Sequence, residues 1–338
     1  MATRKALVSY LVLFAVAGTV SGLGYRLLDW GHDVLGCMAN RKPGTFLAYC
    51  TSDQYGDYEH GAYYFDLEPQ AVGNLRNAKV LVLGNSRAQH GFSTVAVKQF
   101  FADRSIPFHL MAFGYSDGVR LAQDLIEKYD LAPRFLVIDV NPFFPDFLSE
   151  PGRATSEEDK PKWLRPFARL PAWWDYLIKK AFNSSQASLC RLWPSRCEAT
   201  FQTIYRSAKD GSWVLDDFTP ANLPGVPIKP KKLVHIDKQP RPEDLINARR
   251  LFGLVRLPRN CIVFTSAPSN ALDAEPYASE ISRILGVRLV LPQVDGLKVF
   301  DASHLTRSSA ERWSAAVMQE IDPLLPPCLA ARSRTDPE

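Results

Sequence analysis

Lys79-Val-Leu-Val-Leu-Gly-Asn-Ser-Arg87 is the stretch that decides the fold class of this chain. Its apolar residues 80–83 predict a short buried strand, and Gly84-Asn85-Ser86 predicts a sharp turn at the carboxyl end of that strand. A serine there would stand at the edge of an open α/β sheet, where ligands bind. The turn can leave its hydroxyl exposed, which suits a nucleophile. An ordinary strand-to-helix turn capped by Ser86 is the alternative.

Strands and helices are expected to alternate on both sides of a long interruption. The further strands are predicted at 107–113, 134–140, 260–266 and 287–291, and the helices at 93–103, 117–129, 242–255, 274–285 and 308–321. This alternation predicts a three-layer α/β/α domain with a doubly wound parallel sheet over residues 79–325. The pattern breaks between about 142 and 240, which we interpret as a large insertion.

Three other segments surround or interrupt this domain. Residues 27–78 lack sustained periodicity and are expected to form a stalk, and residues 326–338 are expected to form a loose tail. Within the insertion, the segment 163–193 combines tryptophans with basic residues. Such a segment could lie at a lipid interface, cap the mouth of a site, or pack on the sheet.

The amino terminus predicts a membrane anchor over residues 1–26. Arg4 and Lys5 precede an uncharged run, 6–25, that is about long enough to cross a bilayer as a helix, and Arg26 follows it. The preceding basic residues favour a cytoplasmic amino terminus and an exported remainder, so we expect a single-pass protein of the inner (cytoplasmic) membrane with its main domain periplasmic. A cleaved signal peptide is the alternative, because small residues at 15 and 17 offer a cleavage site.

The cysteines fit an oxidising compartment. There are six, an even number, which permits disulfides with fifteen possible pairings. Proximity in the sequence favours Cys37 with Cys50 and Cys190 with Cys197, which leaves Cys261 with Cys328. Free buried cysteines are the alternative.

Composition argues against several functions. The chain has 338 residues and a net charge of only +4, without an arginine-rich block, so we expect no nucleic-acid partner. It has no glycine-rich phosphate loop and no cysteine pair with zinc-ligand spacing. We therefore expect no metal and no cofactor, and a phosphate- or nucleotide-binding function is the least favoured alternative.

Three segments far apart in the sequence should meet at one edge of the sheet. Ser86 follows the first predicted strand, Asn141 follows the third, and Asp301-Ala-Ser-His304 follows the last. Because the carboxyl ends of parallel strands share an edge, these residues can converge. Serine, histidine and carboxylate are the components of a nucleophilic relay. Singly, Asp301 and His304 could equally be a turn residue and a surface residue.

These blocks resemble those of the SGNH (GDSL-like) hydrolase superfamily. Gly84-Asn85-Ser86 is similar to its Gly-Asp-Ser block, with Asn in place of Asp, and Asp301-Ala-Ser-His304 matches its Asp-x-x-His block. The resemblance covers about 79–141 and 241–322 and implies a flavodoxin-like three-layer fold. It also implies a catalytic triad of Ser86, His304 and Asp301.

The same resemblance implies an oxyanion hole. Its donors would be the N–H groups of Ser86 and Gly114 and the side-chain amide of Asn141, although Asp139-Val-Asn141 lacks the glycine of the family's third block. Arg87 is a candidate substrate-binding residue, or a surface arginine paired with an acidic neighbour. His90 is interpreted as a bystander.

An amino-terminal anchor joined to such a domain resembles proteins that modify cell-envelope polymers. The resemblance implies a serine esterase or O-acyltransferase that acts on acyl esters of an envelope glycan. Its partners would be an acylated carbohydrate or acyl donor, the membrane, and an integral-membrane acyltransferase. A non-catalytic binding or assembly protein on the same scaffold is the alternative, favoured by the departures at Asn85 and around Asn141.

Overall fold

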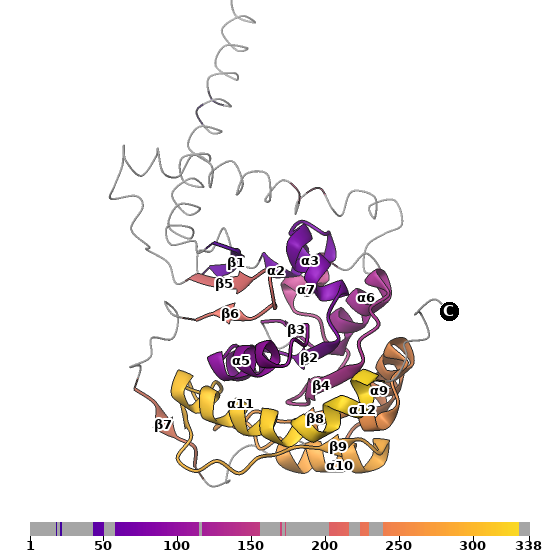
Figure 1. Cartoon of the computed structure of the whole chain (residues 1–338). Helices are drawn as coiled ribbons and strands as arrows, with labels where there is room; N and C mark the ends of the chain where they lie inside the picture. Colours follow the sequence, from indigo (N-terminus) through magenta and orange to yellow (C-terminus); the bar gives the residue numbers. More distant parts are fainter. Residues whose placement is uncertain are drawn as a thin grey trace, which may run out of the picture.

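A five-stranded parallel sheet forms the centre of the chain (Figure 1). The computed structural model describes residues 43–50, 58–114, 117–155, 203–215, 224–229 and 239–330, with single positions at 18, 21, 170 and 173. The strands, in their order across the sheet, are β3 (Phe108–Ala112), β2 (Val80–Gly84), β4 (Phe135–Asp139), β8 (Ile262–Thr265) and β9 (Arg288–Leu289). Every neighbouring pair is parallel, which confirms the predicted α/β class.

Both faces of the sheet are covered by helices. Val80 and Val82 belong to one buried cluster and Leu81 and Leu83 to the other, because successive side chains of a strand point to opposite faces. The first face packs against α4 (Ser86–Phe92), α5 (Val95–Asp103) and α11 (Arg307–Ile321). The second packs against α6 (Val119–Tyr129), α9 (Pro242–Val255) and α10 (Glu275–Leu285). Figure 1 shows α5 and α11 crossing the same face.

The strand order places a crevice where the sequence predicted the site. β2 comes first along the chain among the parallel strands, yet it lies between β3 and β4, which come second and third. The chain therefore leaves β2 and β4 in opposite directions, and the carboxyl ends of these two strands open a crevice that suits a ligand. Ser86 lies directly after β2, and Asn141 lies directly after β4.

A second, antiparallel sheet corrects the prediction of a stalk at 27–78. It consists of β1 (Thr45–Cys50), β5 (Thr203–Ser207) and β6 (Trp213–Val214), so it joins that segment to the insertion. The helices α2 (Glu59–Tyr64) and α3 (Pro69–Arg76) follow β1 and pack into the main core. The prediction was wrong for the described part of this segment, because short elements show no period and the partner of β1 is remote in sequence.

The rest of the insertion is less regular. It contributes α7 (Glu150–Thr155) and β7 (Val226–Pro227), and β7 pairs antiparallel with β10 (Lys298–Val299). The aromatic and basic segment 163–193 lies outside the described residues except for two positions, 170 and 173, and so does most of the predicted anchor. In the described part of the chain, no helix is long and apolar enough to cross a bilayer.

The carboxyl-terminal region is tied to the sheet. After α11 the chain forms η4 (Asp322–Leu324) and α12 (Leu325–Ala330), and Cys328 forms a disulfide with Cys261 in η3 (Arg259–Cys261). This pairing confirms the sequence-based expectation. The prediction of a loose tail from residue 326 was wrong as far as residue 330, because the disulfide and the buried Leu325 hold this helix against the sheet. Cys50 is also disulfide-bonded.

Removing the Cys261–Cys328 disulfide should lower the free energy of unfolding by about 2–4 kcal/mol. The bond closes a loop with a sequence separation of 67 residues, and its loss increases the conformational entropy of the unfolded chain. The measurement is urea unfolding of the double variant Cys261→Ser/Cys328→Ser against the wild-type protein without reductant. An unchanged unfolding midpoint would contradict the prediction.

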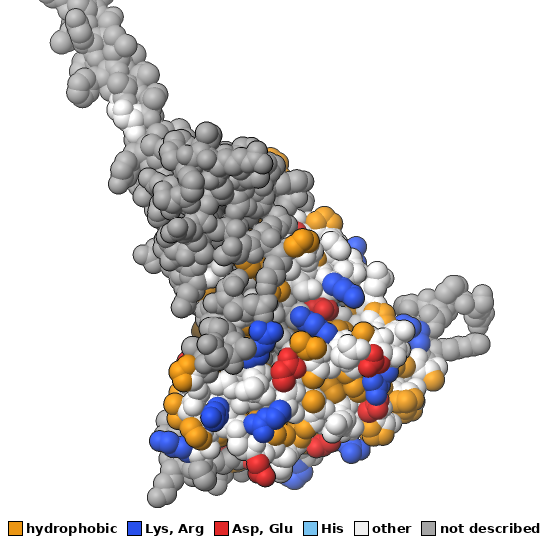
Figure 2. Space-filling model, turned by 60° about the vertical axis from the view of Figure 1, so that its left-hand side comes forward, with side chains coloured by type: hydrophobic (Ala, Val, Ile, Leu, Met, Phe, Trp, Pro, Cys, Tyr) orange, Lys and Arg blue, Asp and Glu red, His pale blue; other side chains and the backbone are white. Residues whose placement is uncertain are grey.

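The described surface carries mixed charge. Figure 2 shows Lys and Arg side chains interspersed with Asp and Glu side chains over the described part of one face. Such a mixture creates no extended potential of one sign on that face.

Candidate active site

The turn after β2 is shaped by a close backbone approach. A Cβ atom on Gly84 would lie 2.5 Å from the Cβ of Ala88 and 3.1 Å from the Cβ of Asp139, so only glycine fits without a shift. Helix α4 begins immediately afterwards at Ser86. As the first residue of the helix, Ser86 has a backbone N–H without a carbonyl partner in that helix. The sequence predicted the turn but missed α4.

The two side-chain contacts of Asn85 explain why an amide, and not a carboxylate, occupies this position. Its side-chain oxygen accepts a hydrogen bond from the N–H of Arg87 (3.0 Å) and so caps α4. Its Nδ2 donates to the backbone carbonyl of Asn141 (2.5 Å), which joins the turn after β2 to the turn after β4. An ionised aspartate could make the first contact but could not donate the second.

A short turn presents Asp301 and His304. Val299 and Leu305 form an antiparallel bridge that closes the turn, and the N–H of Phe300 donates to the carbonyl of His304 (3.0 Å). Asp301 Oδ1 accepts the backbone N–H of His304 (2.8 Å), so the same carboxylate that faces the imidazole also fixes the backbone that carries it.

Ser86, His304 and Asp301 form a continuous chain of contacts. His304 Nε2 lies 2.9 Å from Ser86 Oγ, and His304 Nδ1 lies 2.6 Å from Asp301 Oδ2. Because an ionised carboxylate only accepts, Nδ1 carries the proton and Nε2 accepts the serine hydroxyl. Ser86 is half-buried. The arrangement has the geometry of a nucleophile, a general base and an orienting acid.

Asp301 is held in its charged form. Burial by itself would raise the pKa of this carboxyl, but the hydrogen bond from the His304 imidazole, its charge, and the N–H groups of His304 and Ser303 lower the pKa to about 2. The carboxylate is therefore ionised over the whole range in which an imidazole titrates, and it favours the imidazolium that forms when His304 accepts a proton.

Aromatic rings pack around the imidazole. His90 lies 4.4 Å from His304 between ring centroids, and Phe300 lies 5.8 Å from His304 with nearly parallel rings. Trp213 of β6 contacts His90 edge-on at 5.5 Å. Burial, together with repulsion from His304, lowers the pKa of His90 well below 6.5, so His90 is neutral. The interpretation of His90 as a bystander missed this packing; its position one helical turn after Ser86 was the available signal.

Arg87 bridges the crevice. Its Nε donates to Ser303 Oγ (2.9 Å) and its Nη1 donates to Asn141 Oδ1 (2.8 Å). Burial lowers the pKa of the guanidinium, and the nearby Asp139 and Asp301 partly offset this effect. Within the described residues, Nη2 donates no hydrogen bond, so Arg87 retains donors beside the nucleophile.

Two of the predicted oxyanion donors are engaged elsewhere. The N–H of Gly114 donates to Glu59 Oε1 (3.4 Å) in the buried interior. Asn141 donates from Nδ2 to the carbonyl of Ala267 (2.9 Å), while its oxygen accepts from Arg87. Gly114 is therefore not a free donor at the site, and Asn141 positions Arg87. The third predicted donor, the N–H of Ser86, lies at the first position of α4, where it has no carbonyl partner within the helix.

A buried ion pair holds the Trp213 side chain that packs against His90. Glu59 and Arg206 are fully buried and form a contact of 2.7 Å. Glu59 also accepts a hydrogen bond from Trp213 Nε1 (2.9 Å), and Arg206 donates to the carbonyl of Leu110 (2.6 Å). The pair therefore fixes Trp213, whose ring contacts His90. No local pattern in the sequence predicted this network, because its members lie in segments far apart.

Asp139, at the end of β4, is a buried carboxylate that the sequence analysis did not assign to the site. Its Oδ1 accepts N–H groups of Asn141 (3.3 Å) and Ala267 (3.4 Å), whereas Oδ2 has no hydrogen-bond partner in the described part of the chain. Burial raises the pKa of Asp139 to about 7, against the opposing attraction of Arg87. An acidic residue that ends an entirely apolar strand was the signal in the sequence.

Replacing Asp139 by asparagine should change how stability depends on pH. Because the folded-state pKa of Asp139 is raised, its contribution to stability is full below the unfolded pKa near 4 and is lost as the pH rises to about 7. Asp139→Asn should therefore gain roughly 1–3 kcal/mol relative to wild type between pH 4 and pH 8. Urea unfolding at both pH values measures this; a constant difference between the proteins would refute the assignment.

The described residues offer no metal site, because no group of three or more His, Cys, Asp or Glu side chains among them could hold an ion. Comparisons with protein-family models, with curated proteins and with solved structures found no match to this chain.

Proposed function

We propose that this chain is a serine esterase or O-acyltransferase of the SGNH type, with Ser86 as nucleophile, His304 as general base and Asp301 as the orienting acid. The observation that carries the proposal is the relay itself: 2.9 Å from Ser86 Oγ to His304 Nε2, and 2.6 Å from His304 Nδ1 to Asp301 Oδ2. The position of Ser86 at the crevice between β2 and β4 supports it.

The chemistry follows from the protonation states. His304 Nε2 takes the proton of Ser86 as Oγ attacks the ester carbonyl, and Asp301 stabilises the resulting imidazolium. The tetrahedral intermediate collapses when His304 protonates the departing alcohol, which leaves an acyl ester on Ser86. Water or a sugar hydroxyl then gives its proton to His304 as its oxygen attacks the acyl carbonyl. The second tetrahedral intermediate releases the acid or the new ester, and His304 returns the proton to Ser86 Oγ. The two acceptors distinguish an esterase from a transferase.

Arg87 is the second oxyanion donor in this proposal. The tetrahedral intermediate carries its negative charge on the former carbonyl oxygen, where fixed donors are most effective. The N–H of Ser86 supplies one donor, and Nη2 of Arg87 supplies the other. The contacts of Arg87 with Ser303 and Asn141 hold the guanidinium in place before the charge develops. Arg87 thus takes the position in the mechanism that the family resemblance had given to Gly114 and Asn141.

The proposed substrate is an acyl ester of a cell-envelope glycan, and the proposed location is the periplasmic side of the inner membrane. These parts rest on the basic residues and the apolar run at the amino terminus, and on the resemblance of that architecture to polymer-modifying proteins. The disulfide between Cys261 and Cys328 supports an oxidising compartment. An integral-membrane acyltransferase is the proposed protein partner.

One observation favours a non-catalytic binding protein as the second candidate. The N–H of Gly114 is directed to Glu59, so the hole has fewer backbone donors than the family pattern implies. In this alternative the crevice binds an acylated carbohydrate without cleaving it.

A fluorophosphonate probe separates the two functions. The reagent phosphonylates a serine only when a base activates its oxygen. We expect the full-length protein to be labelled once, and peptide mass spectrometry should locate the label at Ser86. Labelling should be lost in His304→Ala and retained in His109→Ala, since the His109 imidazole is buried beside Tyr63 (2.7 Å) and away from the relay. Absence of label on Ser86 would favour the binding protein.

A further inference from the structure

A second cavity lies at the carboxyl ends of β8 and β9. It encloses about 460 Å³, within the range of about 300–1,000 Å³ that is typical of small-molecule sites. Three of its polar lining residues come from different segments: Ser266 follows β8, Glu275 begins α10, and Gln293 follows β9. The mouth of a parallel sheet is where such folds bind ligands, and neither Ser86 nor His304 lines this cavity.

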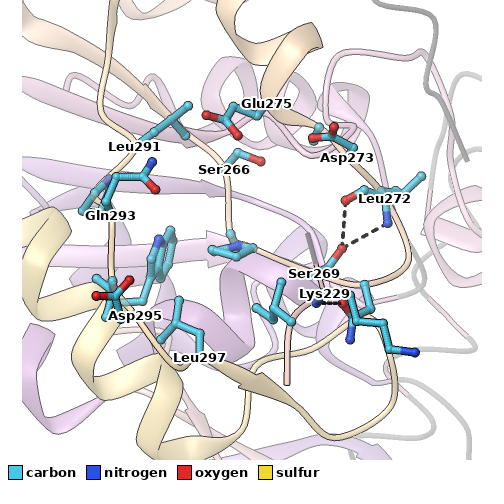
Figure 3. A pocket seen from close by; sticks show the side chains of 18 of the residues that line it. Lys229, Ser266, Ser269, Leu272, Asp273, Glu275, Leu291, Gln293, Asp295 and Leu297 are labelled. Atoms are coloured by element: carbon cyan, nitrogen blue, oxygen red, sulfur yellow. Dashed lines mark hydrogen bonds between the residues drawn. The ribbon is translucent and has the colours of Figure 1, made fainter. Parts of the chain in front are cut away.

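Ser266 supplies a hydroxyl to the lining. Its residue is only 8% exposed and borders the cavity. Figure 3 shows Ser266, Glu275 and Gln293 directed toward the same hollow, with Lys229 and Asp295 at the rim. The hydroxyl of Ser266 can therefore donate a hydrogen bond to an occupant of the cavity or accept one from it.

The lining restricts the chemistry of that occupant. Lys229 is the single cationic side chain among the described residues that line the cavity, so an anionic ligand would meet little opposite charge there. No metal-binding cluster is present among the described residues. Apolar side chains complete the lining; among them are Ile228, Pro268, Leu272, Leu291, Pro292, Val294 and Leu297. Hydrogen-bonding groups interleaved with apolar walls match the hydroxyl edges and C–H faces of a neutral sugar.

The cavity adjoins the catalytic turn. The N–H groups of Asn270 and Ala271, in the loop that lines the cavity, both donate to the carbonyl of Ala302 (2.8 and 2.9 Å), between Asp301 and His304. Ala302 has a φ of +68°, a conformation that an alanine adopts only when its surroundings hold it there. The same loop thus supports the turn of the relay and forms one wall of the cavity.

We propose that this cavity binds a neutral sugar unit, with Ser266, Glu275 and Gln293 as its hydrogen-bonding groups. The choice of a sugar rests on the proposed function, and it deepens that function by giving the glycan substrate a second contact beside the reacting unit. The occupant makes no covalent bond and needs no cofactor.

Saturation-transfer NMR on the full-length Ser86→Ala protein tests the proposal without turnover. The probes are two neutral disaccharides, cellobiose and diacetylchitobiose, with digalacturonic acid as the anionic probe and spermidine as the cationic one. We expect a neutral disaccharide to bind, and Ser266→Ala and Glu275→Gln each to weaken that binding about tenfold or more. Gln293→Ala changes an exposed side chain, so it can replace Ser266→Ala or Glu275→Gln as the test variant if either of them fails to fold.

Glu280→Gln is the matched control, because Glu280 lies on the same helix but pairs with Arg283 (2.6 Å). It should leave disaccharide binding unchanged. Failure of both disaccharides to bind, binding of spermidine in their place, or binding that is unaffected by the cavity variants would overturn the proposal. Hydrolysis of a small ester by the wild-type protein, measured separately, reports on the proposed function alone. The two proposals can therefore fail independently.

Discussion

Replacing Ser86 by alanine is expected to lower kcat/KM for a small ester such as 4-nitrophenyl acetate by about 10⁴- to 10⁶-fold. The variant loses the oxygen that lies 2.9 Å from His304 Nε2, so no acyl-enzyme can form and only water attack within the site remains. The substitution removes one atom from a half-buried residue, so the fold should be retained. Steady-state hydrolysis by the full-length protein is the measurement.

The losses of activity caused by replacing Ser86 and His304 should not add. Because Ser86 and His304 act as one unit, the double variant Ser86→Ala/His304→Ala should be no slower than the slower single variant. Ser279→Ala, an exposed serine on α10, is the control and should retain wild-type turnover. A Ser86→Ala protein with more than about one tenth of wild-type activity would be incompatible with the relay.

Replacing Arg206 by methionine is expected to destabilise the fold by about 3–5 kcal/mol. The substitution removes the guanidinium that pairs with the fully buried Glu59 carboxylate, while the hydrogen bonds from Trp213 Nε1 and the N–H of Gly114 remain. An uncompensated charge in the interior is far more costly than the loss of a pair at the surface. The measurement is the urea unfolding midpoint of the full-length protein.

Two further variants make this prediction specific. Arg104→Met removes a bidentate ion pair with Asp322 on the surface and should leave the unfolding midpoint nearly unchanged. Arg206→Met/Glu59→Gln should recover part of the loss, because the buried charge is then absent. Equal effects of Arg206→Met and Arg104→Met would show that burial of the pair contributes nothing.

The parts of the site that the sequence predicted are those encoded within a few residues. Apolar runs mark the parallel strands, and Ser86 follows such a run directly. Asp301 and His304 instead follow the short antiparallel strand β10, in a turn that the bridge between Val299 and Leu305 closes. The packing of Trp213 against His90 depends instead on the pairing of β1 with β5, whose members lie more than 150 positions apart. No periodicity within a window reports such a pairing.

Residue type alone did not identify the oxyanion donors correctly. Gly114 and Asn141 have suitable groups and suitable positions along the chain. Whether those groups are free depends on Glu59 and Ala267, which the sequence did not connect to them. The bridging role of Arg87 could not be inferred either, because it requires Ser303 and Asn141 to approach from different strands.

The contacts that hold the His304 imidazole determine the order in which the first product leaves and the acceptor enters in the proposed reaction. Both ring nitrogens are engaged, and His90 and Phe300 pack against the ring, so the imidazole cannot turn to serve a second position. The first product must therefore vacate the space beside Nε2 before the acceptor can enter it. Double-reciprocal plots against acyl donor, at several acceptor concentrations, should then give parallel lines, the kinetic mark of a ping-pong enzyme.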